Sequence, residues 1–534
     1  MKRISRHILE LTLAVVSLVI GASPVLAAPS QQEIDQSVRR AMEEFQVPGM
    51  AVSVVHDGAL YYSAGHGVLE AGKEQAVDDR TLFQIASVSK AFTAAALALL
   101  ADEGKLAWDD RVIDHLPEFR MFDPWVTREF TIRDLLTHRS GLPLGAGDLL
   151  VFPEGNATRE EIIHALRYFE PSSSFRSKFD YDNLLYIVAG EVVARVSGLS
   201  FEDFLEQRLL VPLGMADCSA SFERAAEGAA KATPHLLMDG ELQTTTAGAD
   251  GVIAAAGGVN CSARSMARWL AFVLNKGLTE DGVQLITTAQ FNQLLSPVTI
   301  LPPAGYLEEH AGSWLSAYAL GWNVSTFYGQ PMLAHAGGLW GMTTFVMVLP
   351  KQNLAIFASN NLMSPAPRAI VNDIADRFLV GDEAAARPAG DPATNKDWIA
   401  IIADVYRERQ KGAADTVAEA AASRAADSTP SLPLDAYAGT YRDPWYGDVH
   451  ITLGEDGVLQ FRSDRNEPLQ GPLEHFQYDT FIARWTDRQL MADAYVSFSL
   501  SPEGGIERIR MKAVSPMTDF SYDFHDLDLR RVQQ

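Results

Sequence analysis

The distribution of apolar and polar residues near the N-terminus predicts a mixed α/β protein. Residues 31–45 carry four apolar side chains at helical spacing: Ile34, Val38, Met42 and Phe45. Residues 50–67 have the pattern of two strands, joined by Asp57-Gly58, a dipeptide typical of tight hairpins. A helix followed by antiparallel strands predicts a sheet with helices packed against it.

The stretch FQIASVSKAFTAAALALL, residues 83–100, departs from this amphipathic pattern. Nearly every position after Lys90 is Leu, Ala or Phe, so the predicted helix is apolar on all sides and must be buried. We expect it to pack against the sheet. An unpaired ammonium group costs several kcal/mol to bury, so Lys90 in the first turn requires a chemical explanation.

The pattern changes in the last third of the chain. Further apolar helices are predicted at residues 183–198 and 262–277, and late strands at 335–350 and 354–360. Residues 381–395 resemble a linker, and the Ala-rich, charged run up to residue 427 predicts a connecting helix. After Pro430, short alternating strands are separated by turns at 443–444, 455–457 and 503–505, which predicts a small antiparallel barrel.

The N-terminus has the pattern of a secretory signal peptide. Basic residues Lys2, Arg3 and Arg6 precede an apolar run, residues 11–20, and Val25 and Ala27 fit a small-x-small cleavage rule. A membrane anchor is the alternative, but ten apolar residues fall short of the ~20 that span a bilayer. We therefore expect an exported protein, periplasmic or extracellular, without a stable membrane anchor.

These boundaries predict four segments. They are a signal peptide over 1–27, an α/β domain over 28–381, a linker with a connecting helix over 382–432, and a barrel over 433–534. No internal repeat is visible.

Charge and cysteine content narrow the function classes. The net charge is −24, and removal of the signal peptide, with three basic residues and one acidic residue, would make it −26. Such a surface repels nucleic acid and anionic lipid, so neither is an expected partner. The only cysteines are Cys218 and Cys261, and their spacing leaves open whether they pair or stay reduced.

Ser87 and Lys90 form the first candidate catalytic pair. In a helix, positions i and i+3 share one face, so the Lys90 amine can reach the Ser87 oxygen. A lysine desolvated by Ala, Phe and Leu has a lowered pKa and can act as a base toward a serine. A bare S-x-x-K is more often an N-cap serine with a solvated lysine.

Tyr181 and Asn183 form a second candidate cluster, between a Ser/Phe-rich loop and an apolar helix. We expect a lysine nearby to lower the pKa of the Tyr181 phenol, which would then move a proton between the nucleophile and the leaving group. Asn183 could hydrogen-bond a substrate amide. The alternative is an N-cap asparagine beside an anchoring aromatic residue.

HAGGLWGM, residues 335–342, is the third cluster. Its glycines allow another backbone to approach closely. If the strand borders the cleft, His335 faces the substrate, and the N–H groups of Gly338 and Ser87 can form an oxyanion hole. A glycine-rich strand end with a solvent-exposed histidine is the alternative.

In this order and spacing, S-x-x-K, Y-x-N and H-x-G resemble the serine hydrolase superfamily of penicillin-binding proteins and class C β-lactamases. VPGMAVSVVHDG, TIRDLLTHRSGLP and YALGW support the resemblance, which covers roughly residues 30–380. YAGTYRDPWYGDVHITL, which begins at Tyr437, resembles the lipocalin-like barrel appended to many such hydrolases. The resemblance implies a β-lactamase/DD-peptidase-like α/β fold: an antiparallel sheet flanked by helices, with an all-helical subdomain.

The resemblance also implies roles for the matched residues. Ser87 would be the nucleophile, Lys90 with Tyr181 the acid–base pair, and Asn183 a substrate-positioning residue. His335, Gly337 and Gly338 would form the strand at the edge of the cleft. No metal or organic cofactor is implied.

One departure bears on the substrate. Penicillin-cleaving relatives usually have K-T-G where this chain has H-A-G. A histidine of ordinary pKa is mostly neutral at pH 7 and grips a carboxylate less well than lysine does. This favours a peptidase of the D-amino-acid type or an esterase, with a small-molecule or peptide substrate.

Several alternatives remain at this point. A true β-lactamase, or a penicillin-binding sensor that is acylated without turnover, would carry the same motifs. G-x-S-x-G and H-E-x-x-H are absent from the chain, which disfavours an α/β-hydrolase and a zinc protease. The barrel could bind a ligand, cover the cleft or mediate homo-oligomerisation.

Overall fold

The computed structural model describes residues 28–246, 251–380 and 396–533. The predicted signal peptide and the linker-like stretch 381–395 lie outside the described residues.

An eight-stranded antiparallel sheet, in the order β2-β1-β12-β11-β10-β9-β8-β7, organises the first domain. Its strands are β1 (Gly49–His56), β2 (Ala59–Gly67), β7 (Thr299–Leu301), β8 (Ser316–Tyr318), β9 (Asn323–Phe327), β10 (Gln330–Leu339), β11 (Met342–Leu349) and β12 (Leu354–Asn360). The hairpin predicted at Asp57-Gly58 is confirmed. Both residues have positive φ, as a tight turn between twisted strands requires.

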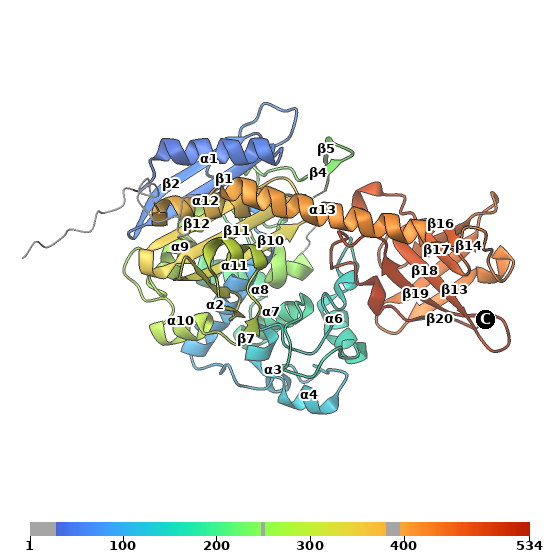
Figure 1. The fold of residues 1–534 in the computed structure, drawn as a ribbon. Helices are drawn as coiled ribbons and strands as arrows, with labels where there is room; N and C mark the ends of the chain where they lie inside the picture. The colour runs from blue at the N-terminus through green and yellow to red at the C-terminus, as the bar shows by residue number, and fades with distance from the viewer. Residues whose placement is uncertain (1–27, 247–250, 381–395, 534) are drawn as a thin grey trace, which may run out of the picture.

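Helices cover both faces of this sheet (Figure 1). On one face, α1 (Gln31–Glu44) and α12 (Ala366–Val380) share an apolar core with the strands, whereas α9 (Ala263–Leu274) packs on the other. A capping box between Ser30 and Glu33 starts α1, and the helix buries Ile34 and Val38 toward the sheet, as its spacing predicted.

A helical subdomain lies beside the sheet. Its helices are α2 (Ser89–Asp102), α3 (Val112–His115), α4 (Pro124–Glu129), α5 (Ile132–Leu135), α6 (Arg159–Ala165), α7 (Leu184–Ser197), α8 (Phe201–Leu205) and α10 (Thr288–Leu295). A short helix, α11 (Gly305–Ala311), precedes β8. Two small two-stranded antiparallel sheets complete the domain: β3 (Phe83–Gln84) pairs with the distant β6 (Asn260–Cys261), and β4 (His235–Met238) forms a hairpin with β5 (Glu241–Thr244).

The expectation that the Ser87 helix lies on the sheet is wrong for most of its length. The body of α2 packs against α7, α8, α10 and the π-helical turn Ala254–Gly258, and the turn that precedes it contacts β10 and β11. A helix that is apolar on all sides can be surrounded by other helices as readily as it can lie on a sheet, and α2 is enclosed in this way.

The C-terminal domain is a closed eight-stranded antiparallel barrel, as predicted. Its strands are β13 (Gly439–Asp443), β14 (Gly447–Leu453), β15 (Leu459–Ser463), β16 (Gln470–Gln477), β17 (Thr480–Ala483), β18 (Ala494–Leu500), β19 (Ile506–Ala513) and β20 (Leu529–Arg531). The connecting helix α13 (Trp398–Ala422) packs on α1 and α12 and runs outward to the barrel (Figure 1).

The barrel also docks directly on the first domain. The Asn466 side-chain amide donates to the carbonyl oxygens of Leu149, Phe152 and Pro153 at 3.0–3.1 Å. The Asp523 carboxylate accepts from the backbone N–H of Gly147. Loop 145–155 of the first domain is therefore a main docking point for the barrel.

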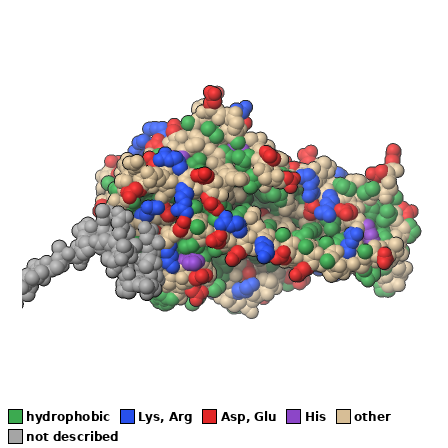
Figure 2. All heavy atoms as spheres, turned by 45° about the horizontal axis from the view of Figure 1, so that its top comes forward, with side chains coloured by type: hydrophobic (Ala, Val, Ile, Leu, Met, Phe, Trp, Pro, Cys, Tyr) green, Lys and Arg blue, Asp and Glu red, His purple; other side chains and the backbone are tan. Residues whose placement is uncertain are grey.

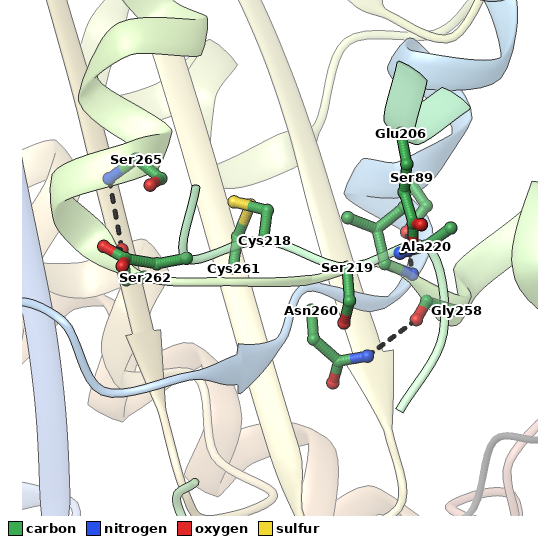
Figure 3. Close-up of a disulfide and its surroundings, with 12 residues drawn as sticks. Ser89, Glu206, Cys218, Ser219, Ala220, Gly258, Asn260, Cys261, Ser262 and Ser265 are labelled. Atoms are coloured by element: carbon green, nitrogen blue, oxygen red, sulfur yellow. Dashed lines mark hydrogen bonds between the residues drawn. A yellow bond between two sulfur atoms is a disulfide. The ribbon is translucent and has the colours of Figure 1, made fainter. Parts of the chain in front are cut away.

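Cys218 and Cys261 form a disulfide, which settles a question that their spacing left open. Figure 3 shows it at the end of β6, beside Ser219 and Asn260, which exchange backbone hydrogen bonds. The bond ties residues 215–220 to the strand that pairs with β3, just before the Ser87 turn.

On the face drawn in Figure 2, acidic and basic side chains are interspersed over the surface.

Within the described residues, no single helix is long and apolar enough to cross a membrane. The helical segments Leu184–Ser197 and Phe201–Leu210, which are bent by 76° relative to each other, are long and apolar enough only when taken together.

Candidate active site

Ser87 lies in the 3-10 turn Ala86–Val88, directly before α2. Ala86 has φ +48°, an unfavourable backbone conformation for a residue with a Cβ, and such strain is typical of functional turns. A hydrogen bond 3.0 Å long, from the Ile85 N–H to the Val259 carbonyl oxygen, anchors this turn to a segment distant in sequence. Ser87 is thus presented half-buried at the head of a buried helix.

The Lys90 ammonium group is fully buried and donates to three oxygens. Its Nζ lies 3.2 Å from Ser87 Oγ, 2.7 Å from Asn183 Oδ1 and 2.8 Å from the carbonyl oxygen of Ala256. Burial lowers the pKa of Lys90 to about 7, although the Asp148 and Asp182 carboxylates act in the opposite direction. A large share of the molecules therefore carries a neutral amine beside Ser87 near neutral pH.

Tyr181 reaches the same serine from the loop before α7. Its ring stacks on His138 with centroids 4.1 Å apart, and Lys90 Nζ lies 4.8 Å from its centroid. The expectation of a lowered phenol pKa is wrong. Burial raises the pKa of Tyr181 well above its usual value, and the hydrogen bond with Ser87 offsets only part of this effect. The phenol is therefore a proton donor at neutral pH.

Asn183 occupies the N-cap position of α7, but its side chain does not cap the helix. The amide oxygen accepts from Lys90, and the amide nitrogen donates to Asp148 Oδ2 at 2.8 Å. Asn183 therefore stands at the N-cap position, as the alternative predicted, but its side chain makes no capping hydrogen bond. The side-chain amide instead binds Lys90, and Asn183 also lines the cleft.

His335 lies on β10 and is buried at the edge of the cleft. Its Nδ1 lies 2.6 Å from the carbonyl oxygen of Ala336, and its Nε2 lies 2.9 Å from the Tyr318 hydroxyl. Nδ1 must therefore carry the proton, while Nε2 accepts from the tyrosine. Burial lowers the pKa of His335 to about 3, so the ring is neutral throughout the physiological range.

Gly337 and Gly338 bring β10 close to the nucleophile turn. A Cβ on Gly337 would lie 2.2 Å from the carbonyl oxygen of Ile85, so only glycine permits this approach. Gly338 is exposed, with open space where its Cβ would be. Both glycines line the same cleft as Ser87.

A cleft of about 410 Å³ opens above Ser87. Its wall combines the predicted residues, except the fully buried Lys90, with apolar and aromatic side chains, among them Phe152, Phe179, Ile253, Tyr318 and Phe520. Asp519, Phe520 and Ser521 of the barrel form one side. Two modules that are distant in sequence therefore enclose the candidate site.

Three residues of this site were missed by the sequence analysis: Asp148, Tyr318 and Ser521. Tyr318 belongs to YALGW, which carried the family resemblance but no assigned role. Asp148 and Ser521 lie in loops without periodicity, and only the docking of the barrel brings them together. No group of three or more His, Cys, Asp or Glu side chains suited to a metal ion occurs among the described residues.

Residues 34–380 match the beta-lactamase family. The chain belongs to this family. Residues 423–531 match a domain described as a domain of unknown function (DUF3471), and they include every strand of the barrel.

Named relatives are similar to this chain over 64% to 89% of its length. The chain is 27% identical over 498 residues to a protein named unguisins hydrolase ungD' of Aspergillus campestris, covering 89% of this chain and 88% of the relative. It is 26% identical to protein flp of Staphylococcus aureus, covering 64% of each chain. The match to the beta-lactamase family, together with a relative named as a hydrolase, identifies the protein as a serine hydrolase.

Solved structures share the two-domain fold. An octameric penicillin-binding protein homologue from Pyrococcus abyssi superposes with a TM-score of 0.59 at 21% identity, covering 90% of this chain and 97% of that structure. The SurE crystal structure gives a TM-score of 0.53 at 20% identity and covers 94% and 99%. The predicted fold class, a β-lactamase-like α/β domain followed by a barrel, is confirmed.

Proposed function

We propose that this protein is an exported hydrolase that cleaves amide or ester bonds through an acyl-enzyme on Ser87. The observation that carries the proposal is the fully buried Lys90 amine, 3.2 Å from Ser87 Oγ, with a pKa lowered to about 7. An amine of this kind removes a proton from a serine at neutral pH, which a solvated lysine cannot do.

The reaction has two halves. Neutral Lys90 takes the Ser87 hydroxyl proton as Oγ attacks the substrate carbonyl carbon, and the N–H groups of Ser87 and Gly338 accommodate the oxyanion. Tyr181 gives its phenol proton to the leaving nitrogen or oxygen, and Lys90 returns a proton to Tyr181. Water then attacks the ester by the same route in reverse, and Ser87 recovers its proton.

The cleft favours substrates with apolar or aromatic groups, because five Phe and Tyr side chains and the aliphatic Ile253 and Leu339 line its wall. His335 is neutral and so offers no cation to a substrate carboxylate. A peptidase of the D-amino-acid type or an esterase therefore remains the favoured activity. A β-lactamase and an acylated sensor without turnover are the alternatives.

The Cys218–Cys261 disulfide supports the proposed export, because such bonds persist in oxidising compartments. Homo-oligomerisation through the barrel stays a prediction, which light scattering of the purified protein tests. The Pyrococcus abyssi homologue is described as octameric.

Mass spectrometry after treatment with a fluorophosphonate or a penicillin tests the nucleophile. We expect one adduct on the peptide that contains Ser87 and none in Ser87→Ala. Turnover of a panel of D-peptides, L-peptides and nitrophenyl esters then ranks the activities. Adducts elsewhere, or full turnover by Ser87→Ala, would contradict the proposal, whereas a lasting stoichiometric adduct without turnover would favour the sensor.

A further inference from the structure

The barrel supplies more than a wall to the cleft, because one of its serines reaches the hydrogen-bond network of the candidate base. Ser521 Oγ donates to Asp148 Oδ2 at 2.8 Å, and both groups are buried. Asp148 in turn accepts from Asn183, whose amide oxygen holds Lys90. Three hydrogen bonds thus join the barrel to the amine beside Ser87.

Asp148 determines which way the Asn183 amide faces. An amide has one acceptor end and one donor end, and a carboxylate oxygen that already accepts from Ser521 offers only an acceptor to it. The amide nitrogen must therefore point to Asp148 and the oxygen to Lys90, at 2.8 Å and 2.7 Å. With the amide reversed, two donors would face each other at Lys90.

The barrel also fixes the loop that carries Asp148. The Asp523 carboxylate accepts from the N–H groups of Gly147 and Leu149 at 2.7 Å and 3.0 Å, on both sides of Asp148. The same loop donates from Gly145 N–H to the Tyr181 carbonyl oxygen at 2.8 Å. Loop 145–149 is therefore attached to the barrel on one side and to the catalytic segment on the other.

We propose that Asp148 is a positioning residue for Lys90 and that the barrel, through Ser521 and Asp523, holds Asp148 in place, so that the hydrolase site is complete only when the barrel is docked. This inference rests on the proposed role of Lys90 as the base. It gives the C-terminal domain a part in the chemistry of the first domain.

Asp148 also contributes a charge to the surroundings of Lys90. The titratable groups that face the amine are those of Asp148, Asp182, His138, His335, Tyr181 and Tyr186. Asp519 and Asp523 in turn act on Asp148 with their negative charge, and Lys90 acts on it with its positive charge. Burial raises the pKa of Asp148 to about 7, so its carboxyl group is charged in part of the molecules near neutral pH. Because this charged form favours the ammonium form of Lys90, removal of Asp148 shifts the activity of Lys90 toward lower pH.

The test compares four variants of the full chain with the wild type: Ser521→Ala, Asp148→Asn, Asp148→Ala and, as a matched control, Ser499→Ala on the exposed face of β18. The second-order rate of fluorophosphonate attachment to Ser87 is measured between pH 5.5 and 9. Thermal unfolding of each variant checks the fold.

We expect the rate to fall about three- to tenfold in Ser521→Ala, since one hydrogen bond is lost, and about a hundredfold in Asp148→Ala, since the amide loses its orientation. Asp148→Asn keeps a side-chain oxygen that accepts a hydrogen bond but loses the negative charge. In this variant, the pH at which the labelling rate reaches half its maximum is therefore expected to fall by about one unit. The control keeps the wild-type rate and midpoint.

Wild-type rates and an unchanged midpoint in both Ser521→Ala and Asp148→Asn would overturn the inference while leaving the Ser87 mechanism intact. A lower rate in Asp148→Asn without a shifted midpoint would also overturn it, because a purely structural role predicts that result. Absence of label on Ser87 in the wild type would remove the proposed function and this inference together. If Asp148→Ala does not fold, the other two variants still decide.

Discussion

At the scale of single residues, burial decides the division of labour between Lys90 and Tyr181. The same apolar surroundings destabilise the charged form of each group, so they lower the pKa of the amine and raise that of the phenol. The neutral amine becomes the better base and the neutral phenol the better acid. The sequence placed both residues in the site and left open which one takes the serine proton.

This assignment predicts the pH dependence of activity. The base must be neutral, so kcat/KM is expected to rise with pH between about 6 and 8, around the Lys90 pKa of about 7. The pKa values of Asp148 and Asp182 are also raised by burial to about 7. The midpoint of the kcat/KM profile therefore reflects the coupled titration of Lys90, Asp148 and Asp182. Initial rates with an ester substrate across this range measure it.

Lys90→Arg is the matched control for that profile. Arginine keeps the positive charge and the donors but stays protonated at every accessible pH. We expect its activity to fall by at least about a hundredfold across the whole range. A flat wild-type profile from pH 5.5 to 8.5, or an active Lys90→Arg protein, would show that Lys90 is not the base.

At the scale of elements, the approach of β10 to the Ser87 turn is what creates the cleft. The strand passes so close to Ile85 that the position of Gly337 has no room for a Cβ, and the next residue faces open space. Alternation along a strand explains this contrast between neighbours. The two glycines therefore provide a test in which the chemical change is the same and the surroundings differ.

Gly337→Ala is expected to destabilise the protein by about 1–3 kcal/mol and to lower kcat/KM at least tenfold, because the strand or the turn must move. Gly338→Ala keeps its backbone N–H and should change stability by less than about 0.5 kcal/mol. Thermal unfolding and ester hydrolysis of both variants give the comparison. Equal stability losses in the two would show that β10 does not press on the turn.

The disulfide supports the same turn from the other side. It ends at β6, which pairs with β3 immediately before Ser87. Removing the bond in the double variant Cys218→Ala/Cys261→Ala is expected to cost about 2–5 kcal/mol of unfolding free energy. Urea unfolding of the variant and of the wild type, with and without reductant, measures the loss. A wild type that is equally stable with reductant would argue against the bond.

At the scale of the whole molecule, the two domains together form the cleft at Ser87, because residues of both line it. The connecting helix α13 sets the barrel beside the first domain, and loop 145–155 receives it. Asn466 makes three of the interdomain hydrogen bonds, because its side-chain amide donates to three carbonyl oxygens of the first domain. Such a contact fixes how the barrel faces the cleft.

Asn466→Ala is expected to loosen this docking, because the carbonyl groups of buried Leu149 and of half-buried Phe152 and Pro153 would lose their donor, at a cost of about 1–3 kcal/mol. Hydrogen exchange in residues 145–155 should become faster, and Ser87 labelling slower. Thr452→Ala, on the exposed outer face of β14, is the control. Unchanged exchange in the loop would mean that other contacts hold the barrel.

Local physics made several features predictable from the sequence. The 3.6-residue period defined α1, the Asp57-Gly58 turn defined the first hairpin, and the regular turns after Pro430 defined the barrel. The spacing of Ser87 and Lys90 already placed both on one helical face, and the structure brings Tyr181, Asn183 and His335 to the same cleft. The elements follow from interactions between residues close in sequence, and the composition of the cleft follows from three motifs that occur in a fixed order along the chain.

Only the tertiary structure decided the rest. The helix that carries Ser87 is enclosed by other helices. The phenol pKa of Tyr181 rises because the effect of burial exceeds that of the hydrogen bond with Ser87. The Asn183 side chain binds Lys90 and does not cap its helix. Asp148 and Ser521 are 373 positions apart and meet only when the barrel docks. Desolvation and long-range hydrogen bonds depend on the complete packing, which no local pattern in the sequence encodes.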